Sequence, residues 1–292
     1  MKRIAIQFSG LFRGLRFKEN RDLQHERTVK SFEDQGFEVD TFWFLYDKEL
    51  PKDSKIIPSL SDTFNAKKIT VYKDSAIQSL LLSSNIEKNF SFPESWYETS
   101  IDNTVLLNFF GEKTKVSKYH NCYGWFKYLF SLKKCTELRK LYEKEQNTKY
   151  DLILLVEVSS IPDDKFIFQE TQESIHVSKE HRQEHIKDKL INGYWGSFFM
   201  GNEKNIDTIC NLYDYMIKKE FENDDSEISN YIYSEKIYKK YIDSKCKVEY
   251  TLPIPKTKLR WFFPLGGDDD VDAYLSKYNT SMKKLKETYP EE

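Results

Sequence analysis

Acidic and hydroxyl side chains follow a short apolar run near the middle of the chain. Leu152 to Val156 is unbroken by polar residues, and Glu157, Ser159 and Ser160 come directly after it. A run of this length is typical of a strand buried on both faces. In open α/β sheets, the loops after such strands converge on the ligand, so we expect the functional site beside Glu157. A carboxylate there can bind a divalent cation or accept a proton from a substrate hydroxyl.

A second group suited to ligand binding follows the first predicted strand, Arg3 to Phe8. The chain continues Ser9-Gly10-Leu11-Phe12-Arg13-Gly14. Two glycines allow the backbone to turn sharply and approach a ligand, and Arg13 can offer a bidentate fork to a phosphate. An ordinary turn between a strand and a helix has the same pattern, so both interpretations stay open.

Histidines and acidic residues elsewhere have spacings that metal sites use. His181 and His185 stand at i, i+4, which can place two imidazoles on one metal ion. They have no neighbouring cysteine or H-E-x-x-H pattern, and the charged stretch from Pro162 to Asn192 favours a solvated helix. The run Asp268 to Asp270 follows two glycines, which is more typical of a solvated loop than of a metal site.

Aromatic residues near expected strand ends could pack against the apolar faces of sugars. Trp195 lies in a glycine-rich aromatic stretch, and Trp261 follows Arg260 in the C-terminal part of the chain. We therefore expect these three residues to bind a sugar or an acceptor. Most of the other aromatic side chains are needed for the core.

Apolar patterns predict the elements that position these residues. Besides the strands at Arg3 to Phe8 and Leu152 to Val156, we expect strands at Glu38–Tyr46, Lys68–Tyr72, Gly193–Gly201 and Lys247–Leu252, and helices at Asn20–Gln35, Asn121–Gln146, Ile206–Phe221 and Ser229–Ser244. Strands that alternate with helices predict parallel pairing and right-handed crossovers. The expected fold is a single α/β, Rossmann-like domain over residues 1–252, with a mostly parallel central sheet flanked by helices. Residues 253–292 would form an extension packed on or near the site.

Bulk composition narrows the class of protein. Hydrophobic residues make up 39% of the chain, enough for a core, and 45 basic residues against 47 acidic ones give a net charge of −2. This balance argues against a dedicated nucleic-acid binder. Four scattered cysteines without a C-x-x-C pair argue against a zinc site or a disulfide framework. Because we find neither a signal peptide nor an apolar run of roughly 20 residues, we expect a cytoplasmic protein without a transmembrane segment.

Several motifs, taken in order, resemble GT-A-type glycosyltransferases of the kind found in bacterial surface-polysaccharide clusters and some large viruses. The similar segments are Ser9-Gly10-x-x-Arg13, Asp40 to Asp47, Leu132 to Leu138 with Tyr142 to Glu145 and Tyr150 to Ile153, and Phe198 to Asn202. The resemblance implies a GT-A fold, a nucleotide-sugar donor, a glycan or other hydroxyl acceptor, and Mn²⁺ or Mg²⁺ as an optional cofactor.

The resemblance also assigns positions to the donor site. Ser9, Gly10, Arg13 and Asp47 would bind the donor, with Arg13 toward phosphate. For the chemistry of transfer, Glu157 is the candidate metal ligand, and Arg13 and Arg260 are alternative cations. Glu157, Asp163 and Asp164 are the candidate bases.

The end of the central strand departs from the family pattern R-x-R-P-D. Leu155 to Ser159 occupies those positions, with Glu157 in place of the second arginine, and Gly196 replaces a later aspartate. These differences leave open a non-catalytic relative that binds a nucleotide or a glycan. Another α/β nucleotide-binding enzyme, such as a kinase or a nucleotidyl transferase, is a third alternative, although the chain lacks a G-x-x-x-x-G-K-[ST] loop.

Overall fold

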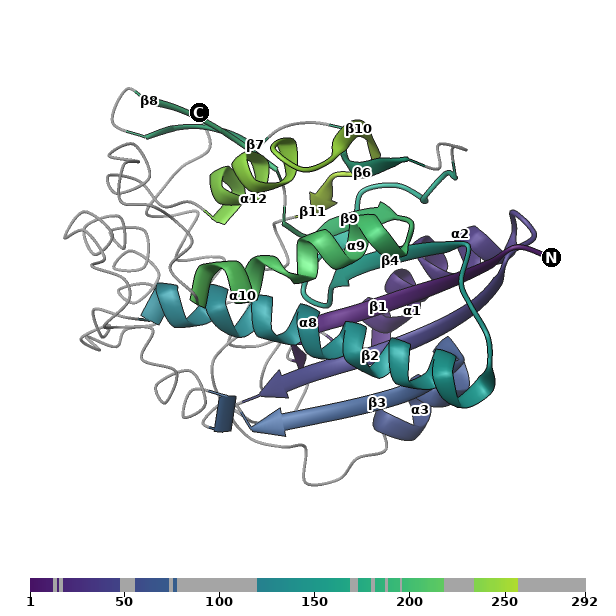
Figure 1. Cartoon of the computed structure of the whole chain (residues 1–292). Helices are drawn as coiled ribbons and strands as arrows, with labels where there is room; N and C mark the ends of the chain where they lie inside the picture. The colour runs from purple at the N-terminus through teal and green to yellow at the C-terminus, as the bar shows by residue number, and fades with distance from the viewer. Residues whose placement is uncertain are drawn as a thin grey trace, which may run out of the picture.

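The structure of the chain is a computed structural model, shown in Figure 1. It describes residues 1–12, 15, 18–47, 56–73, 76–77, 120–168, 173–179, 182–186, 189–194, 196–217 and 234–256. All structural statements below concern these residues.

A seven-stranded sheet with the order β10-β6-β9-β4-β1-β2-β3 forms the centre of the molecule. Its strands are β1 (Arg3–Leu11), β2 (Glu38–Asp47), β3 (Ala66–Lys73), β4 (Leu152–Glu157), β6 (Ser174–Ser178), β9 (Phe198–Gly201) and β10 (Lys247–Leu252). Neighbouring strands pair in parallel, except that β9 is antiparallel to both β4 and β6. The predicted α/β class with a mostly parallel sheet is therefore confirmed.

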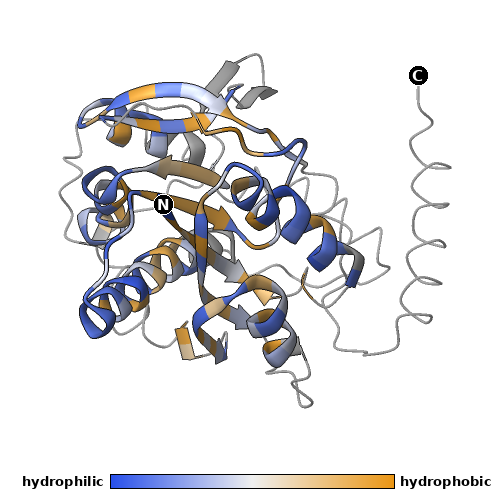
Figure 2. Ribbon diagram, turned by 90° about the vertical axis from the view of Figure 1, so that its right-hand side faces the viewer, coloured by the Kyte–Doolittle hydropathy of each residue, from blue (hydrophilic) through white to orange (hydrophobic). Residues whose placement is uncertain are grey.

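Helices cover both faces of this sheet (Figure 1). One face packs against α1 (Lys18–Arg27), α2 (Val29–Glu33) and α3 (Ile56–Phe64), and the other against α8 (His120–Gln146), α9 (Glu203–Cys210), α10 (Leu212–Ile217) and α12 (Ser234–Asp243). Apolar strands lie between helices whose outer sides are hydrophilic, as Figure 2 shows. The two apolar layers on either side of the sheet form the core.

Alternation along β1 shows how one strand supplies both layers. Ile4, Ile6 and Phe8 point to the side of α1 and α2, and Phe8 stacks on Trp43 of β2 with ring centroids 4.0 Å apart. Ala5 belongs to the opposite layer, under α8. This side-chain period of two also determines which residues at the end of the strand face α8.

Two small sheets accompany the central one. β5 (Ile161–Pro162) pairs with β11 (Pro255–Lys256), and β7 (Arg182–Ile186) pairs with β8 (Lys189–Gly193). β11 belongs to the predicted extension, so the start of that segment contacts the domain directly after β4. Residues 257–292 lie outside the described part of the chain.

Three predicted elements need correction. The stretch from Pro162 to Asn192, expected as a charged helix, contains β6, β7 and β8, because alternation in β6 buries Ile175 and Val177 against the layer under α8. The single helix expected from Asn20 to Gln35 is two helices that meet at Thr28. The strand expected from Gly193 to Gly201 begins only at Phe198, after a turn.

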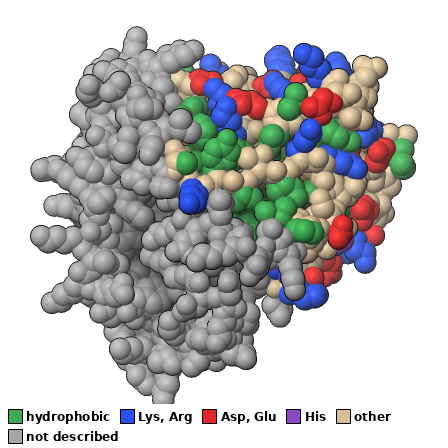
Figure 3. All heavy atoms as spheres, turned by 90° about the horizontal axis from the view of Figure 1, so that it is seen from below, with side chains coloured by type: hydrophobic (Ala, Val, Ile, Leu, Met, Phe, Trp, Pro, Cys, Tyr) green, Lys and Arg blue, Asp and Glu red, His purple; other side chains and the backbone are tan. Residues whose placement is uncertain are grey.

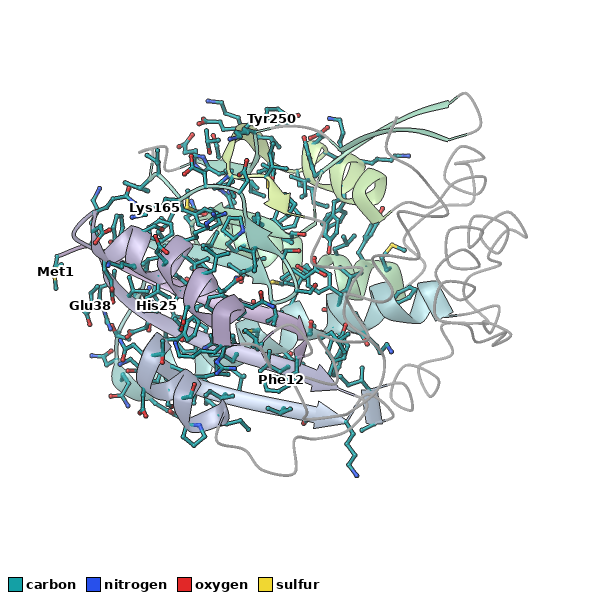
Figure 4. The ribbon with its side chains drawn as sticks, turned by 180° about the vertical axis from the view of Figure 1, so that it is seen from behind. Met1, Phe12, His25, Glu38, Lys165 and Tyr250 are labelled. Atoms are coloured by element: carbon teal, nitrogen blue, oxygen red, sulfur yellow. The ribbon has the colours of Figure 1, made fainter. Side chains whose placement is uncertain are left out.

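The amino ends of the strands are held together by a buried aspartate. Asp40 Oδ2 accepts hydrogen bonds from Arg3 Nη2 at 2.8 Å and from the Tyr150 hydroxyl at 2.7 Å. In Figure 4, Glu38 at the start of β2 and Phe12 just after β1 lie at opposite ends of the sheet. Asp40 therefore fixes the end of the sheet opposite to the one where β1 and β4 finish.

None of the described helices combines the length and the apolar composition needed to cross a membrane. On the face seen in Figure 3, basic and acidic side chains are mixed around hydrophobic ones.

Candidate functional site

β1 and β4 lie at the point where the strand order reverses. From β1, the chain proceeds through β2 to β3 on one side of the sheet, and it returns by α8 to place β4 on the other side (Figure 1). In open α/β sheets, ligands bind outside the carboxyl ends of the strands at such a switch point. Ser9 of β1 pairs in register with Glu157, the last residue of β4, and β1 ends two residues later at Leu11.

The Glu157 carboxylate is held by hydroxyl groups of three serines. The Ser159 hydroxyl donates to Oε1 at 3.0 Å, and the Ser160 and Ser197 hydroxyls each lie 2.9 Å from Oε2. Glu157 itself is only 8% exposed. The Ser160 hydroxyl also lies 2.8 Å from Ser197 Oγ, so its single proton is shared between that oxygen and the carboxylate. Hydrogen bonds from these hydroxyls stabilise the charged form of a carboxylate and oppose the cost of burying it.

Backbone contacts fix the same residues. The Glu157 amide donates to the Ser197 carbonyl at 2.8 Å, and the Ser160 amide donates to the Glu157 carbonyl at 2.9 Å. The first contact exists because β9 is antiparallel, with Val156 opposite Phe198. An antiparallel strand begins where its neighbour ends, so the residue before β9 lies beside the end of β4.

The turn before β9 is packed tightly between two helices. The Tyr128 hydroxyl of α8 donates to the Gly196 carbonyl at 2.8 Å. A Cβ atom at Gly196 would lie 2.7 Å from Cε2 of Tyr238 on α12. Only glycine fits between these groups without displacement, so this packing determines the position of Ser197.

Gly10 completes the site from β1. Its φ is +124°, in a region that L side chains rarely adopt, and a Cβ atom there would lie 3.8 Å from both Glu157 Cγ and Tyr128 Cδ2. The sharp turn expected at Gly10 is not found, because Gly10 lies within β1 and pairs in register with Leu45. Its positive φ is a local feature of the strand, next to the serine-held carboxylate.

The Ser9 side chain points into the core. The residue is fully buried, and its hydroxyl has no hydrogen-bond partner among the described residues, although it lies close to the Cys135 thiol. Burial raises the pKa of this thiol to about 12, and the nearby Ser9 hydroxyl opposes the shift. The Ser9 carbonyl accepts from the Val158 amide at 3.0 Å, so Ser9 supports the site through its backbone.

Asp163 has contacts of a different kind from those of Glu157. Its Oδ1 accepts the Ile254 amide at 2.7 Å, its own amide donates to the Ile254 carbonyl at 2.8 Å, and Lys179 Nζ lies 3.6 Å from Oδ2. These contacts join the chain after β5 to the chain before β11. Asp164 Oδ1 accepts the adjacent Lys165 amide at 2.8 Å.

Several predicted site residues lie outside the described part of the chain. Asp47 is the last residue of β2 and pairs with Lys73, but its side chain is not described. His185 belongs to β7, and its side chain is likewise not described. Outside the described residues are Arg13, His181, Trp195, Arg260, Trp261 and Asp268 to Asp270.

The described residues do not by themselves fit a resident metal ion. In these parts of the chain, no group of three or more histidine, cysteine, aspartate or glutamate side chains could hold one. Glu157 therefore offers one carboxylate, already bonded to three hydroxyls, and we derive no step through a metal.

A buried polar network supports β1 and α8 beneath the site. Arg139 is fully buried and donates through Nε to Gln7 Oε1 at 2.8 Å and through Nη1 to Glu143 Oε2 at 2.6 Å. Gln7 in turn donates to Thr136 Oγ1 at 2.7 Å. Burial raises the pKa of Glu143, and the charge of Arg139 opposes that shift. This network holds α8, and with it Tyr128, against the sheet.

Sequence reasoning missed Ser197 and Tyr128. Ser197 follows a glycine in an aromatic stretch, and nothing local indicates that the next strand is antiparallel. Tyr128 is buried on α8, and its hydroxyl contact with Gly196 depends on tertiary packing that the helical spacing does not reveal.

Comparison with models of protein families and with curated proteins gave no match to this chain. Fold and site together define an α/β protein with a serine-held carboxylate at the switch point of its sheet.

Proposed function

We propose that this protein is a glycosyltransferase that moves a sugar from a nucleoside-diphosphate donor to a hydroxyl of a glycan or another acceptor. The observation that carries the proposal is the juxtaposition of Gly10, with its positive φ, and the buried Glu157 carboxylate at the switch point between β1 and β4. Nucleotides bind at such points, where the backbone can approach a pyrophosphate closely. The motif resemblance supplies the reaction class, and the α/β sheet agrees with the fold class that the resemblance implies.

The charge of the leaving group determines which residues are needed near the donor. The leaving nucleoside diphosphate gains negative charge during transfer, so cationic groups must stabilise it. Arg13, close in sequence to Gly10, is the first candidate, and Arg260 is the second. Gly10, which has no side chain, would let the diphosphate approach the end of β1.

The serine contacts bear on the role of Glu157. A general base must take up a proton, which becomes harder when three donors stabilise its charged form. The arrangement therefore suits a carboxylate that stays ionised and orients other groups. Asp163 is bonded into the connection between β5 and β11, and we assign no catalytic step to it.

A second candidate function is non-catalytic binding of a nucleotide or a glycan. It is favoured by the low exposure of Glu157, whose two carboxylate oxygens both accept serine hydroxyls. Such a protein would keep Gly10 and the ligand position but would transfer no sugar.

Thermal unfolding in the presence of sugar nucleotides tests the proposal. Ligands that bind only the folded state raise its unfolding temperature with concentration, so UDP-, GDP-, CMP- and dTDP-sugars can be compared with and without Mn²⁺. We expect one nucleotide class to raise the unfolding temperature, and the same compound to be hydrolysed or transferred. Absence of any shift at millimolar concentrations would contradict the transferase and leave non-catalytic binding of a glycan as the remaining candidate.

The Glu157→Gln variant separates the two candidates. We expect it to fold and to bind the sugar nucleotide, because glutamine preserves the shape of the side chain. If the wild-type protein turns over the donor, the variant should lose turnover. Binding without turnover in the wild-type protein would establish the non-catalytic function instead.

A further inference from the structure

Ser159 is the partly exposed member of the serine group around Glu157. Ser160 and Ser197 are 3% and 1% exposed, whereas Ser159 has intermediate exposure. All three hydroxyls contact the same carboxylate, but only that of Ser159 binds Oε1, at 3.0 Å. Among these serines, Ser159 is therefore the one that a ligand can reach.

The carboxylate determines how the Ser159 hydroxyl can bind anything else. A serine hydroxyl has one proton and two lone pairs, and an ionised carboxylate can only accept hydrogen bonds. The contact with Glu157 Oε1 therefore uses the single proton of Ser159. Its oxygen then offers lone pairs alone, so Ser159 recognises a donor group.

A phosphate oxygen cannot satisfy this requirement. The diphosphate of a sugar nucleotide presents hydrogen-bond acceptors only, and the Ser159 hydroxyl has no second proton to donate to it. Each free hydroxyl of the sugar, in contrast, has a proton to donate. The geometry of Ser159 thus separates the sugar from the diphosphate within one ligand.

We propose that Ser159 accepts a hydrogen bond from a hydroxyl of the donor sugar, and that Glu157 acts through Ser159 as a positioning residue. The inference rests on the proposed function, because it names the contact by which the same site would bind its sugar. The position fits, since Ser159 lies two residues beyond the end of β4, and Glu157 and Val158 just before it lie beside Gly10, which would receive the diphosphate.

The test compares a sugar nucleotide with its own nucleoside diphosphate. The probes are the compound with the largest thermal shift and the matching diphosphate, such as UDP-glucose and UDP. Affinities are measured calorimetrically for the wild-type protein, Ser159→Ala and Ser159→Thr, with EDTA and separately with Mn²⁺. Ser61→Ala, an exposed serine on α3, is the matched control.

Loss of one neutral hydrogen bond should reduce affinity roughly 2- to 10-fold. We expect Ser159→Ala to weaken UDP-glucose binding by that factor and to leave UDP binding unchanged. Ser159→Thr retains a hydroxyl and should restore the affinity, and deoxy analogues should identify one sugar hydroxyl whose removal has no further effect in Ser159→Ala.

Four outcomes would overturn the inference. Equal losses for UDP-glucose and UDP would indicate a structural effect of Ser159, and a loss confined to samples with Mn²⁺ would make Ser159 a cation ligand. Unchanged affinity in Ser159→Ala would remove it from the site while the proposed function stands. If the wild-type protein binds no sugar nucleotide, the proposed function and this contact both fail.

Discussion

Replacing Gly196 by alanine tests the packing that positions Ser197. The added Cβ atom would lie 2.7 Å from Cε2 and 3.3 Å from Cδ2 of the Tyr238 ring. Carbon atoms without a bond between them are best separated by roughly 3.5–4.0 Å, so the ring or the turn must move by about 1 Å. Tyr238 is 1% exposed, and the Tyr128 hydroxyl holds the Gly196 carbonyl from the other side.

The cost of this movement follows from the density of the core. Adding a methyl group to a well-packed interior typically destabilises a protein by about 1–3 kcal/mol, and we expect Gly196→Ala to fall in that range. The free energy of unfolding can be measured by urea denaturation followed by far-UV circular dichroism. If the turn moves instead of the ring, sugar-nucleotide affinity should fall as well, because Ser197 would lose its contact with Glu157.

A double-mutant cycle identifies the cause of the effect. Replacing Tyr238 by leucine removes the ring edge, so Gly196→Ala should cost much less in that background. Gly36→Ala is the control, since Gly36 has a φ of +83° and nothing within 4 Å of its added Cβ atom. Its cost comes from the backbone alone and should not depend on Tyr238. An unchanged free energy of unfolding in Gly196→Ala, or an equal cost with leucine at position 238, would refute the reasoning.

Two further predictions concern titratable groups of α8 and α9 that are buried or partly buried. Burial raises the pKa of the Cys135 and Cys210 thiols to about 12, so iodoacetamide at pH 8 should leave both unmodified in the folded protein and modify both in urea. Peptide mass mapping checks this, and rapid labelling of either thiol without urea would contradict it. Burial also raises the pKa of Glu143 from its ordinary value of 4.5, so the folded state binds this proton more tightly than the unfolded chain. The contribution of Glu143 to stability is therefore present below pH 4.5 and is lost as pH rises through the folded pKa. Urea denaturation at several pH values should show this decline in the wild-type protein relative to Glu143→Gln, and a flat difference would exclude it.

Elements with strong local patterns were predictable from the sequence. The apolar run of β4, the helical spacing of α8 and the whole of β10 agree with prediction within a residue or two. β7 and β8 were missed because their stability depends on pairing with each other, and their polar composition resembles a solvated helix.

The candidate site was predictable only in part, for a similar reason. Glu157 was identified because it ends a buried strand, and strand ends gather at one edge of a parallel sheet. Ser197 joins it from a strand whose reversed direction leaves no local trace in the sequence. The Ser9 hydroxyl points to the core because side chains alternate along β1, which the donor-site motif does not take into account.

The insertion of β4 between β1 and β9 has a consequence for the order of folding. β4 hydrogen-bonds on one side to the first strand of the chain and on the other to a strand made after it. Long-range pairings form slowly because loop closure must precede them. A growing chain that ends before Ser197 can bury Glu157 against β1 but lacks one of the three hydroxyls around its carboxylate. The environment of this carboxylate is therefore completed only after β9 has paired with β4. An intact site thus indicates that the central strands of the sheet have all paired.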